Sequence, residues 1–301
     1  MGLPLLSIIV PSYNRNELLD RMLMSVSKCR YPNMEIIIVD DCSIPSCKEI
    51  VEKHRGSINI TYLRNETNQY AEKSRKRGFQ SAIGDFVIFC DDDDFYTDFD
   101  FFNRAIYRLI NDNNLSYVSG NARIYIEKED TIKSNRLNVC GELDGIKYLQ
   151  NFQTKYNKPL STFTTVFRKS SLKGEGLFFN DSSIYMYALL RGNAYIEDNL
   201  VGDYCIHSAN ISYSVSRDFI IASLDSKEYI RRKVSELKLF DENKWWEGQL
   251  ELTSKYYFGN RNINSREILT FYHLVSDRYE MRSFRFFLFC IFNMAKKGLR
   301  R

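Results

Sequence analysis

Four short, mostly apolar runs occupy the first third of the chain, and segments of helical length separate them. Consecutive apolar positions are typical of strands that are buried on both faces. The runs are residues 7–10, 35–39, 59–63 and 85–90. The intervening helical segments are residues 17–27, 46–54 and 71–82. Beyond them we expect a helix at 101–111 and strands at 117–119 and 123–127. This alternation predicts an α/β fold with a Rossmann-like, mostly parallel sheet flanked by helices.

Polar residues follow three of the predicted strands. Tyr13, Asn14 and Arg15 come after the first strand, which Pro11 is expected to end. Residues 40–41 and 91–94 follow the second and fourth strands and are all aspartates. In parallel sheets, ligands bind outside the carboxyl ends of the strands. A single polar end is only a turn, but three on one edge indicate a binding site.

The acidic run is the most informative of these ends. Four adjacent carboxylates repel one another unless solvent or a cation relieves them. A divalent ion such as Mg²⁺ or Mn²⁺ takes oxygen ligands and leaves positions for a substrate's phosphates. The run therefore predicts a metal site, with Asp94 as a neighbour of the helix that follows. Taken alone, it fits a solvated loop or a helix N-terminus equally well.

The other two polar ends fit a nucleotide. The aromatic ring of Tyr13 can meet a nucleobase, and Asp41 can accept a hydrogen bond from a base or a ribose hydroxyl. Both turns also fit helix caps. The formal charge of +4 is close to balanced and argues against nucleic acid as a partner.

The last third of the chain differs in character. Residues 218–301 read as mostly helical and aromatic, so we expect a domain at 1–215 and a helical region at 216–301 for acceptor, oligomer or membrane contact. The apolar run at 284–294 is about half the length that spans a bilayer. It can lie at a membrane surface through residues 284–301, with Arg285 toward the headgroups, or form a core or dimer helix.

Cysteine usage and the N-terminus bear on the compartment. The seven cysteines contain no CxxC pair, and no signal peptide precedes the first strand. We expect a reduced, cytoplasmic protein that can work at the inner face of the cell membrane.

The order and spacing of four segments resemble the GT-A family 2 glycosyltransferases of bacterial cell-surface glycan synthesis. The segments are residues 7–15, 38–43, 74–78 and 82–94. The resemblance implies a metal-dependent, inverting enzyme that moves a sugar from a nucleotide-diphosphate sugar, usually a UDP-sugar. The acceptor would be a hydroxyl of a glycan or a lipid-linked saccharide.

The resemblance also implies roles for individual residues. Asp93, the third residue of an Asp-x-Asp motif, would bind the metal, with Asp91 and Asp92 flanking it at the donor. The residues implied at the nucleotide are Pro11, Tyr13, Arg15, Asp41 and Arg75. Tyr70 and Lys76 stand where the family often has Gly and Asn, which leaves the base preference open.

A catalytic base and a further metal ligand are implied downstream. Asp181, after Asn180, matches the family's acidic pair at a helix start; an N-cap role is the alternative. Asp203 is the second candidate for the base. His207, in the stretch 204–212, matches a histidine that reaches the metal or the leaving diphosphate; the alternative is a half-buried strand histidine.

Two other functions remain open at this point. A catalytically inactive relative that acts as a binding or scaffold subunit would share the fold. A nucleotidyltransferase would also pair a sheet with acidic metal ligands, but it would want a glycine-rich loop after the first strand. Residues 12–14 are not such a loop.

Overall fold

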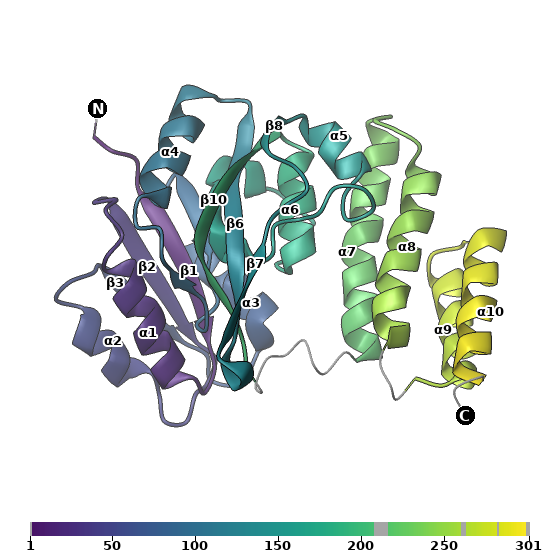
Figure 1. The fold of residues 1–301 in the computed structure, drawn as a ribbon, viewed down its shortest axis with the longest axis horizontal. Helices are drawn as coiled ribbons and strands as arrows, with labels where there is room; N and C mark the ends of the chain where they lie inside the picture. The colour runs from purple at the N-terminus through teal and green to yellow at the C-terminus, as the bar shows by residue number, and fades with distance from the viewer. Residues whose placement is uncertain (1, 208–215, 260–262, 282, 299–301) are drawn as a thin grey trace. The chain divides into compact units, whose positions relative to one another are not determined.

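The chain divides into two compact units in a computed structural model that describes residues 2–207, 216–259, 263–281 and 283–298 (Figure 1). Unit 1 comprises Met1–Phe152 and Tyr156–Ala209, and unit 2 comprises Gln153–Lys155 and Asn210–Arg301. The predicted boundary near residue 215 lies outside the described residues.

A ten-stranded sheet forms the centre of unit 1, in the order β3-β2-β1-β4-β9-β6-β10-β5, with β7 paired to β6 and β8 to β10. The strands are β1 (Leu6–Ser12), β2 (Met34–Asp40), β3 (Ile60–Arg64), β4 (Phe86–Phe89), β5 (Phe95–Tyr96), β6 (Leu115–Ile126), β7 (Thr131–Asn135), β8 (Gly141–Leu143), β9 (Thr165–Arg168) and β10 (Asn193–Ile206). The first four are parallel, as is the pair β6 and β10; the other pairs are antiparallel. The α/β class is therefore confirmed, with the predicted parallel arrangement concentrated in the first four strands.

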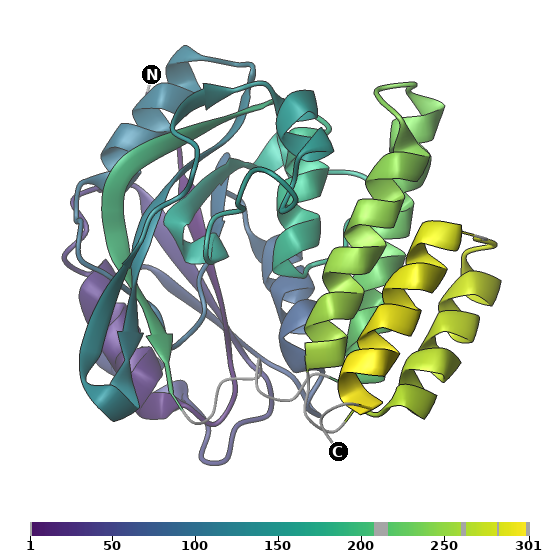
Figure 2. The same cartoon turned by 45° about the vertical axis from the view of Figure 1, so that its right-hand side comes forward.

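Helices cover both faces of this sheet (Figures 1 and 2). The helices of unit 1 are α1 (Asn16–Val26), α2 (Lys48–His54), α3 (Tyr70–Ser81), α4 (Phe101–Asn111), α5 (Gly145–Gln150) and α6 (Asp181–Leu189), with 3-10 turns at Glu127–Glu129, Thr162–Thr164 and Lys169–Leu172. The apolar residues of α1, α2 and α4 share one buried cluster with Ile8, Ile36 and Ile88. Helix α3 packs on β1 and β2. Because the sheet is covered on both sides, its strands can be apolar at successive positions.

Two predicted strand boundaries were wrong. Pro11 does not end β1, which continues to Ser12. The carbonyl of Ile9 accepts from the amide of Cys90, just past the end of β4. Alternate residues of a strand direct their backbone groups to the same neighbour, so the nitrogen of Pro11 also faces the β4 side, where β4 has already ended. A proline there removes at most one terminal ladder bond. The two strands expected at 117–119 and 123–127 are one long strand, β6, which runs beside the green strand β10 in Figure 2.

Helix α3 approaches β1 closely because Gly78 has no side chain. A Cβ at Gly78 would lie 2.5 Å from Ile9 Cγ2, closer than carbon atoms can pack. Arg75 lies one turn earlier on α3 and is buried. The close packing therefore holds Arg75 at a fixed height above the sheet.

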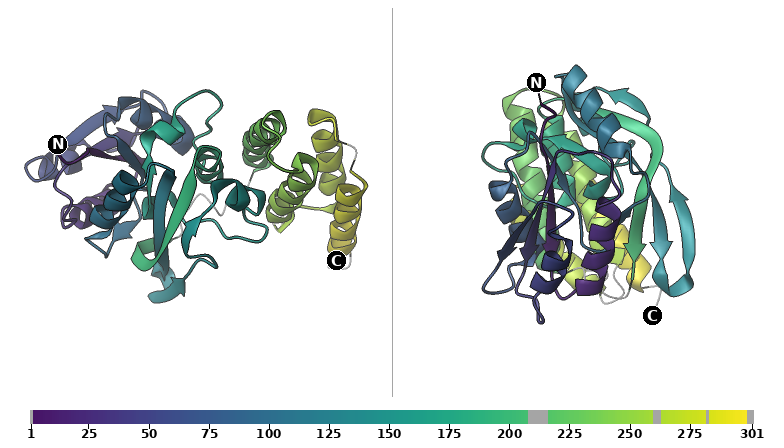
Figure 3. Two further views of the ribbon diagram at one scale, coloured as in Figure 1. Left: turned by 90° about the horizontal axis from the view of Figure 1, so that it is seen from above. Right: turned by 90° about the vertical axis from the view of Figure 1, so that its left-hand side faces the viewer.

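Unit 2 is helical, as expected for the C-terminal region. Its helices are α7 (Arg217–Glu236), α8 (Glu242–Gly259), α9 (Ser265–Arg278) and α10 (Phe284–Gly298). Helix α7 packs on α8, α9 packs on α10, and α10 also contacts α8; all four are seen nearly end-on in the left view of Figure 3. Asn264 and Glu267 form a capping box at the start of α9. Within the described residues, none of the helices has the length and apolar character needed to cross a membrane.

Candidate active site

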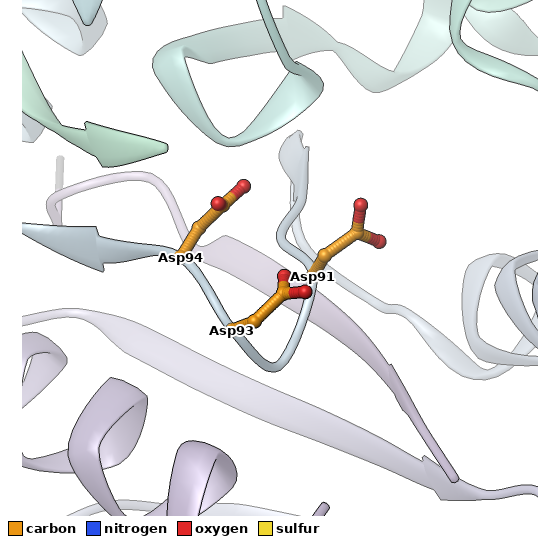
Figure 4. A group of neighbouring side chains, drawn as sticks. All are labelled: Asp91, Asp93 and Asp94. Atoms are coloured by element: carbon orange, nitrogen blue, oxygen red, sulfur yellow. The ribbon is translucent and has the colours of Figure 1, made fainter. Parts of the chain in front are cut away.

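The four aspartates form the loop between β4 and β5, at the carboxyl edge of the parallel strands. Asp91, Asp93 and Asp94 each offer one oxygen, and the three oxygens lie within 4.8 Å of one another. Figure 4 shows the three carboxylates on the same side of the loop. Asp94 leads into strand β5, so this strand separates it from the helix beside which it was expected to lie. Asp92 stands outside this group.

Basic and polar side chains surround the acidic loop. Arg15 Nη1 donates to Asp92 Oδ1 at 3.1 Å and to Asp93 Oδ2 at 3.0 Å. Ser12 Oγ donates to Asp92 Oδ2 at 2.8 Å. His207 Nε2 lies 2.9 Å from Asp93 Oδ2, and both side chains are buried. The end of β1, the start of α1 and the end of β10 therefore meet at two aspartates.

Three carboxyl groups of the acidic loop, those of Asp91, Asp92 and Asp94, have raised pKa values. Burial raises the pKa of Asp92 to about 7. Burial also raises the pKa of Asp91 and that of Asp94, and for Asp94 the charges of Asp93 and Asp91 add to the effect. A divalent cation would relieve this accumulation of buried negative charge. The oxygens of the cluster, with an imidazole beside them, are a donor set that suits Mn²⁺ or Mg²⁺.

Asp94 accepts hydrogen bonds from two distant segments of the chain. Its Oδ1 accepts from the amide of Cys205 at 3.2 Å, and its Oδ2 accepts from Ser161 Oγ at 3.1 Å. The sequence carries no signal for Ser161, because this residue lies 67 residues from Asp94 in a segment without a recognisable motif. Asp94 thus ties the acidic loop to β10 and to the segment before β9.

Arg75 joins the acidic loop to the predicted catalytic base. Its Nη2 donates to Asp91 Oδ1 at 2.6 Å, and its Nη1 donates to Asp181 Oδ1 at 2.8 Å. Arg75 Nε is buried and has no hydrogen-bond partner among the described residues. Burial opposes ionisation of Asp181, but Arg75 and Lys158 outweigh it and lower the pKa of this carboxyl group. Asp181 is therefore a carboxylate at neutral pH.

The alternative that Asp181 is an N-cap was wrong. Helix α6 begins at Asp181, and its cap is Asn180, whose Oδ1 accepts from the amide of Ser183 at 3.0 Å. The second candidate base, Asp203, is a buried carboxylate in β10. Both of its oxygens accept from Arg123, its partner on β6, at 2.6 and 2.7 Å.

Asp41 organises the loop that leads into α3. Its Oδ1 accepts from Asn65 Nδ2 at 2.6 Å and from the amide of Gln69 at 2.8 Å. The described residues donate no hydrogen bond to its Oδ2. Pro11 is buried in β1, and Tyr13 is exposed at the end of the same strand. Like Arg75, whose Nε is unpaired within the described residues, Tyr13 and Asp41 therefore retain groups that a ligand can meet.

Asp40, next to Asp41, holds this edge of the sheet together. It is fully buried and accepts from Tyr62 Oη at 2.6 Å, the amide of Ser43 at 2.7 Å and Arg64 Nη1 at 2.5 Å. Burial opposes its ionisation, but the hydrogen bonds outweigh this and lower its pKa to about 2. Asp40 positions the loop that carries Asp41.

Asp40→Asn should lower the free energy of unfolding at pH 7 by about 2 kcal/mol. A folded-state pKa below the unfolded value contributes stability above pH ~4, and this contribution is lost as pH falls toward 2. Urea unfolding at pH 7, 4 and 3 should show the gap between wild type and variant closing with acidity. Asp100→Asn, at an exposed ion pair with Arg30, is the control and should change stability by less than about 1 kcal/mol. A gap that does not change with pH would contradict the assignment.

With the geometry described, the chain can be compared with known proteins. The family model described as Glycosyl transferase family 2 matches residues 7–174, more than half of the chain. The chain belongs to glycosyl transferase family 2. The predicted family is thus confirmed. Asp181 and His207 lie beyond residue 174, so the family match does not include them.

Two relatives align with different lengths of this family 2 member. It is 28% identical over 240 residues to the GalNAc(5)-diNAcBac-PP-undecaprenol beta-1,3-glucosyltransferase of Campylobacter jejuni, which covers 79% of this chain and 73% of the relative. It is 46% identical over 90 residues to an uncharacterized glycosyltransferase of Haemophilus influenzae. That second match spans only 30% of either protein.

Solved structures support the expected GT-A fold. Staphylococcus aureus TarS 1-349 has a TM-score of 0.67 at 19% identity, covering 91% of this chain and 82% of that one. TarS in complex with UDP-GlcNAc has a TM-score of 0.63 at 21% identity, covering 84% and 72%. The mannosyltransferase PcManGT from Pyrobaculum calidifontis, in complex with GDP-Man and Mn²⁺, has a TM-score of 0.51 at 14% identity, covering 99% and 88%. At these identities the likeness concerns the fold.

Proposed function

We propose that this chain is a metal-dependent, inverting glycosyltransferase that moves a sugar from a UDP-sugar to a hydroxyl of a glycan or lipid-linked acceptor. The observation that carries the proposal is the cluster of Asp91, Asp93 and Asp94, with Arg75 linking it to Asp181. The family membership agrees with it. The name of the Campylobacter relative includes a PP-undecaprenol, which supports a lipid-linked acceptor.

Asp93 and His207 would hold the metal, with Asp91 beside them. A divalent cation bound there would neutralise charge that develops on the leaving diphosphate. The donor set is oxygen-rich and negatively charged, and Asp93 and His207 are buried, which fits this role. The complex of PcManGT with GDP-Man and Mn²⁺ supports the choice of ion.

The donor would lie along the edge formed by the first two strands. Asp41 Oδ2 is suited to accept from the ring N–H of uracil, and the exposed ring of Tyr13 can stack on the base. Arg75 Nε and Arg15 would meet the phosphates, because guanidinium groups bind phosphate oxygens strongly. The UDP-GlcNAc complex of TarS supports a UDP-sugar donor.

Asp181 would act as the general base. The acceptor hydroxyl attacks the anomeric carbon from the face opposite the leaving diphosphate, so the configuration inverts. Asp181 takes the hydroxyl proton as the new bond forms. Asp203 is less suited, because Arg123 occupies both of its oxygens.

Isothermal titration with UDP and with GDP, each with and without Mn²⁺, tests the proposal. UDP with Mn²⁺ should bind tightest and raise the melting temperature most, because a ligand that binds only the native state stabilises it. Asp41→Asn should reduce the preference of UDP over GDP, whereas Asp100→Asn, at a surface ion pair, should leave it unchanged. Equal binding of both nucleotides, with no effect of metal, would contradict the proposal.

A further inference from the structure

Helix α10 of unit 2 presents an apolar face to solvent. Phe284, Leu288, Ile291 and Phe292 are between 41% and 73% exposed. Their spacing of four, three and one places them on one side of the helix. Large apolar side chains scattered singly on a surface are ordinary, but four on one face of one helix form a continuous patch.

The opposite side of α10 is already occupied by the core of unit 2. Phe286 and Cys290 are buried, and the ring of Phe289 stacks on Phe258 of α8 with centroids 6.0 Å apart. The ring of Phe287 packs edge-on against the ring of Tyr272 of α9, with centroids 5.5 Å apart. These contacts fix the rotation of the helix, so the four exposed side chains face away from the core of unit 2.

The charge of α10 is entirely positive. The helix contains Arg285, Lys296 and Lys297 and no Asp or Glu. Arg285 forms an ion pair with Glu251 of α8, whereas it was expected to face lipid headgroups. Lys296 Nζ lies 4.3 Å from the ring centroid of Phe292, and no carboxylate of the described residues pairs with it. A cation therefore borders the apolar face at its C-terminal end.

We propose that this face of α10 docks on an anionic phospholipid surface, with the four apolar side chains in the interface and Lys296 at the headgroups. Apolar burial and attraction to anionic lipid act together in such helices. At 15 residues, or about 22 Å, the helix is too short to cross a bilayer and suits a position in its surface. Docking would bring the chain to lipid-linked acceptors, but the inference rests on unit 2 and does not depend on the proposed function.

A second copy of the chain fits this face less well. Two α10 helices packed against each other would bring their cations together with no acid on either helix. Like charges in contact oppose association. Self-association is therefore an outcome that the test must distinguish.

Sedimentation of the full chain with phosphatidylcholine vesicles, with and without phosphatidylglycerol, tests the proposal. Wild type should bind the anionic vesicles, and binding should weaken as salt is added. The double variant Leu288→Gln/Phe292→Gln should bind at least about tenfold more weakly, because two large side chains lose their apolar contact. Lys296→Gln should weaken binding to anionic vesicles only.

The control is Phe219→Gln/Leu237→Gln, also in unit 2. These residues are 52% and 58% exposed, against 50% and 59% for Leu288 and Phe292. The control should bind vesicles as wild type does. Failure of wild type to bind anionic vesicles at low salt would overturn the proposal, as would equal loss in both double variants. A wild-type dimer that the α10 variant converts to monomer, without vesicle binding, would assign the face to self-association instead.

Discussion

Asp93→Asn should abolish metal binding and reduce sugar transfer on the order of a thousandfold. The change keeps the size of the side chain but removes one negative charge from the group formed with Asp91 and Asp94. It also leaves Arg15 and His207 facing a neutral amide. Titration with Mn²⁺ in the presence of UDP, together with the turnover rate, measures both effects.

Asp92→Asn is the matched comparison, because it alters the neighbouring aspartate of the same loop. The Asp92 carboxylate binds Ser12 and Arg15 and lies outside the three-oxygen cluster. Its pKa of about 7 makes a neutral side chain less disruptive there. Affinity for Mn²⁺ should fall by no more than about tenfold. The assignment of the metal site would be wrong if Asp93→Asn kept the wild-type affinity for Mn²⁺, or if Asp92→Asn lost more of that affinity than Asp93→Asn.

Asp181→Asn should lower kcat by about 10²- to 10⁴-fold while the dissociation constant for UDP stays within a few-fold of wild type. The amide cannot take a proton from the acceptor, but Arg75 still pairs with Asp91. Because the pKa of Asp181 lies below its usual value of 3.8, its ionisation should not limit kcat of wild type between pH 8 and 5.

Asp203→Asn separates the two candidate bases. It should break the ion pair with Arg123 and lower the melting temperature, because the partly buried guanidinium of Arg123 loses its ion-pair partner. Its kcat, measured below the melting temperature, should stay within a few-fold of wild type. A large loss of kcat in Asp203→Asn with little loss in Asp181→Asn would reverse the assignment.

The sheet and the edge that carries the site were predictable because their signals are local. Consecutive apolar residues and helix-length spacing indicated the first four strands, and helix α4 has the predicted bounds, Phe101–Asn111. The ends of parallel strands must lie at one edge, so Tyr13, Asp41 and the acidic run were expected together. The predicted end of β1 at Pro11 was wrong, because Pro11 is tolerated only where the neighbouring strand β4 has already ended.

The roles within the acidic run were not predictable in the same way. The sequence predicts that Asp94 is peripheral and that Asp92 flanks the metal ligand. In the structure Asp94 joins the cluster, and Asp92 turns to Ser12 and Arg15. The backbone angles of each residue decide which side of a tight loop its carboxylate faces. Four identical residues in a row do not indicate these angles.

The sequence by itself determined the fold class, the family and the strand ends at which a site could form, because hydrophobic periodicity and motif spacing lie within short stretches of chain. Tertiary structure decided which groups touch. It joined Arg75 to Asp181, 106 residues away, and paired Asp203 with Arg123 across two strands. Such pairs depend on strand register and on how closely helices pack on the sheet, which are properties of the assembled core.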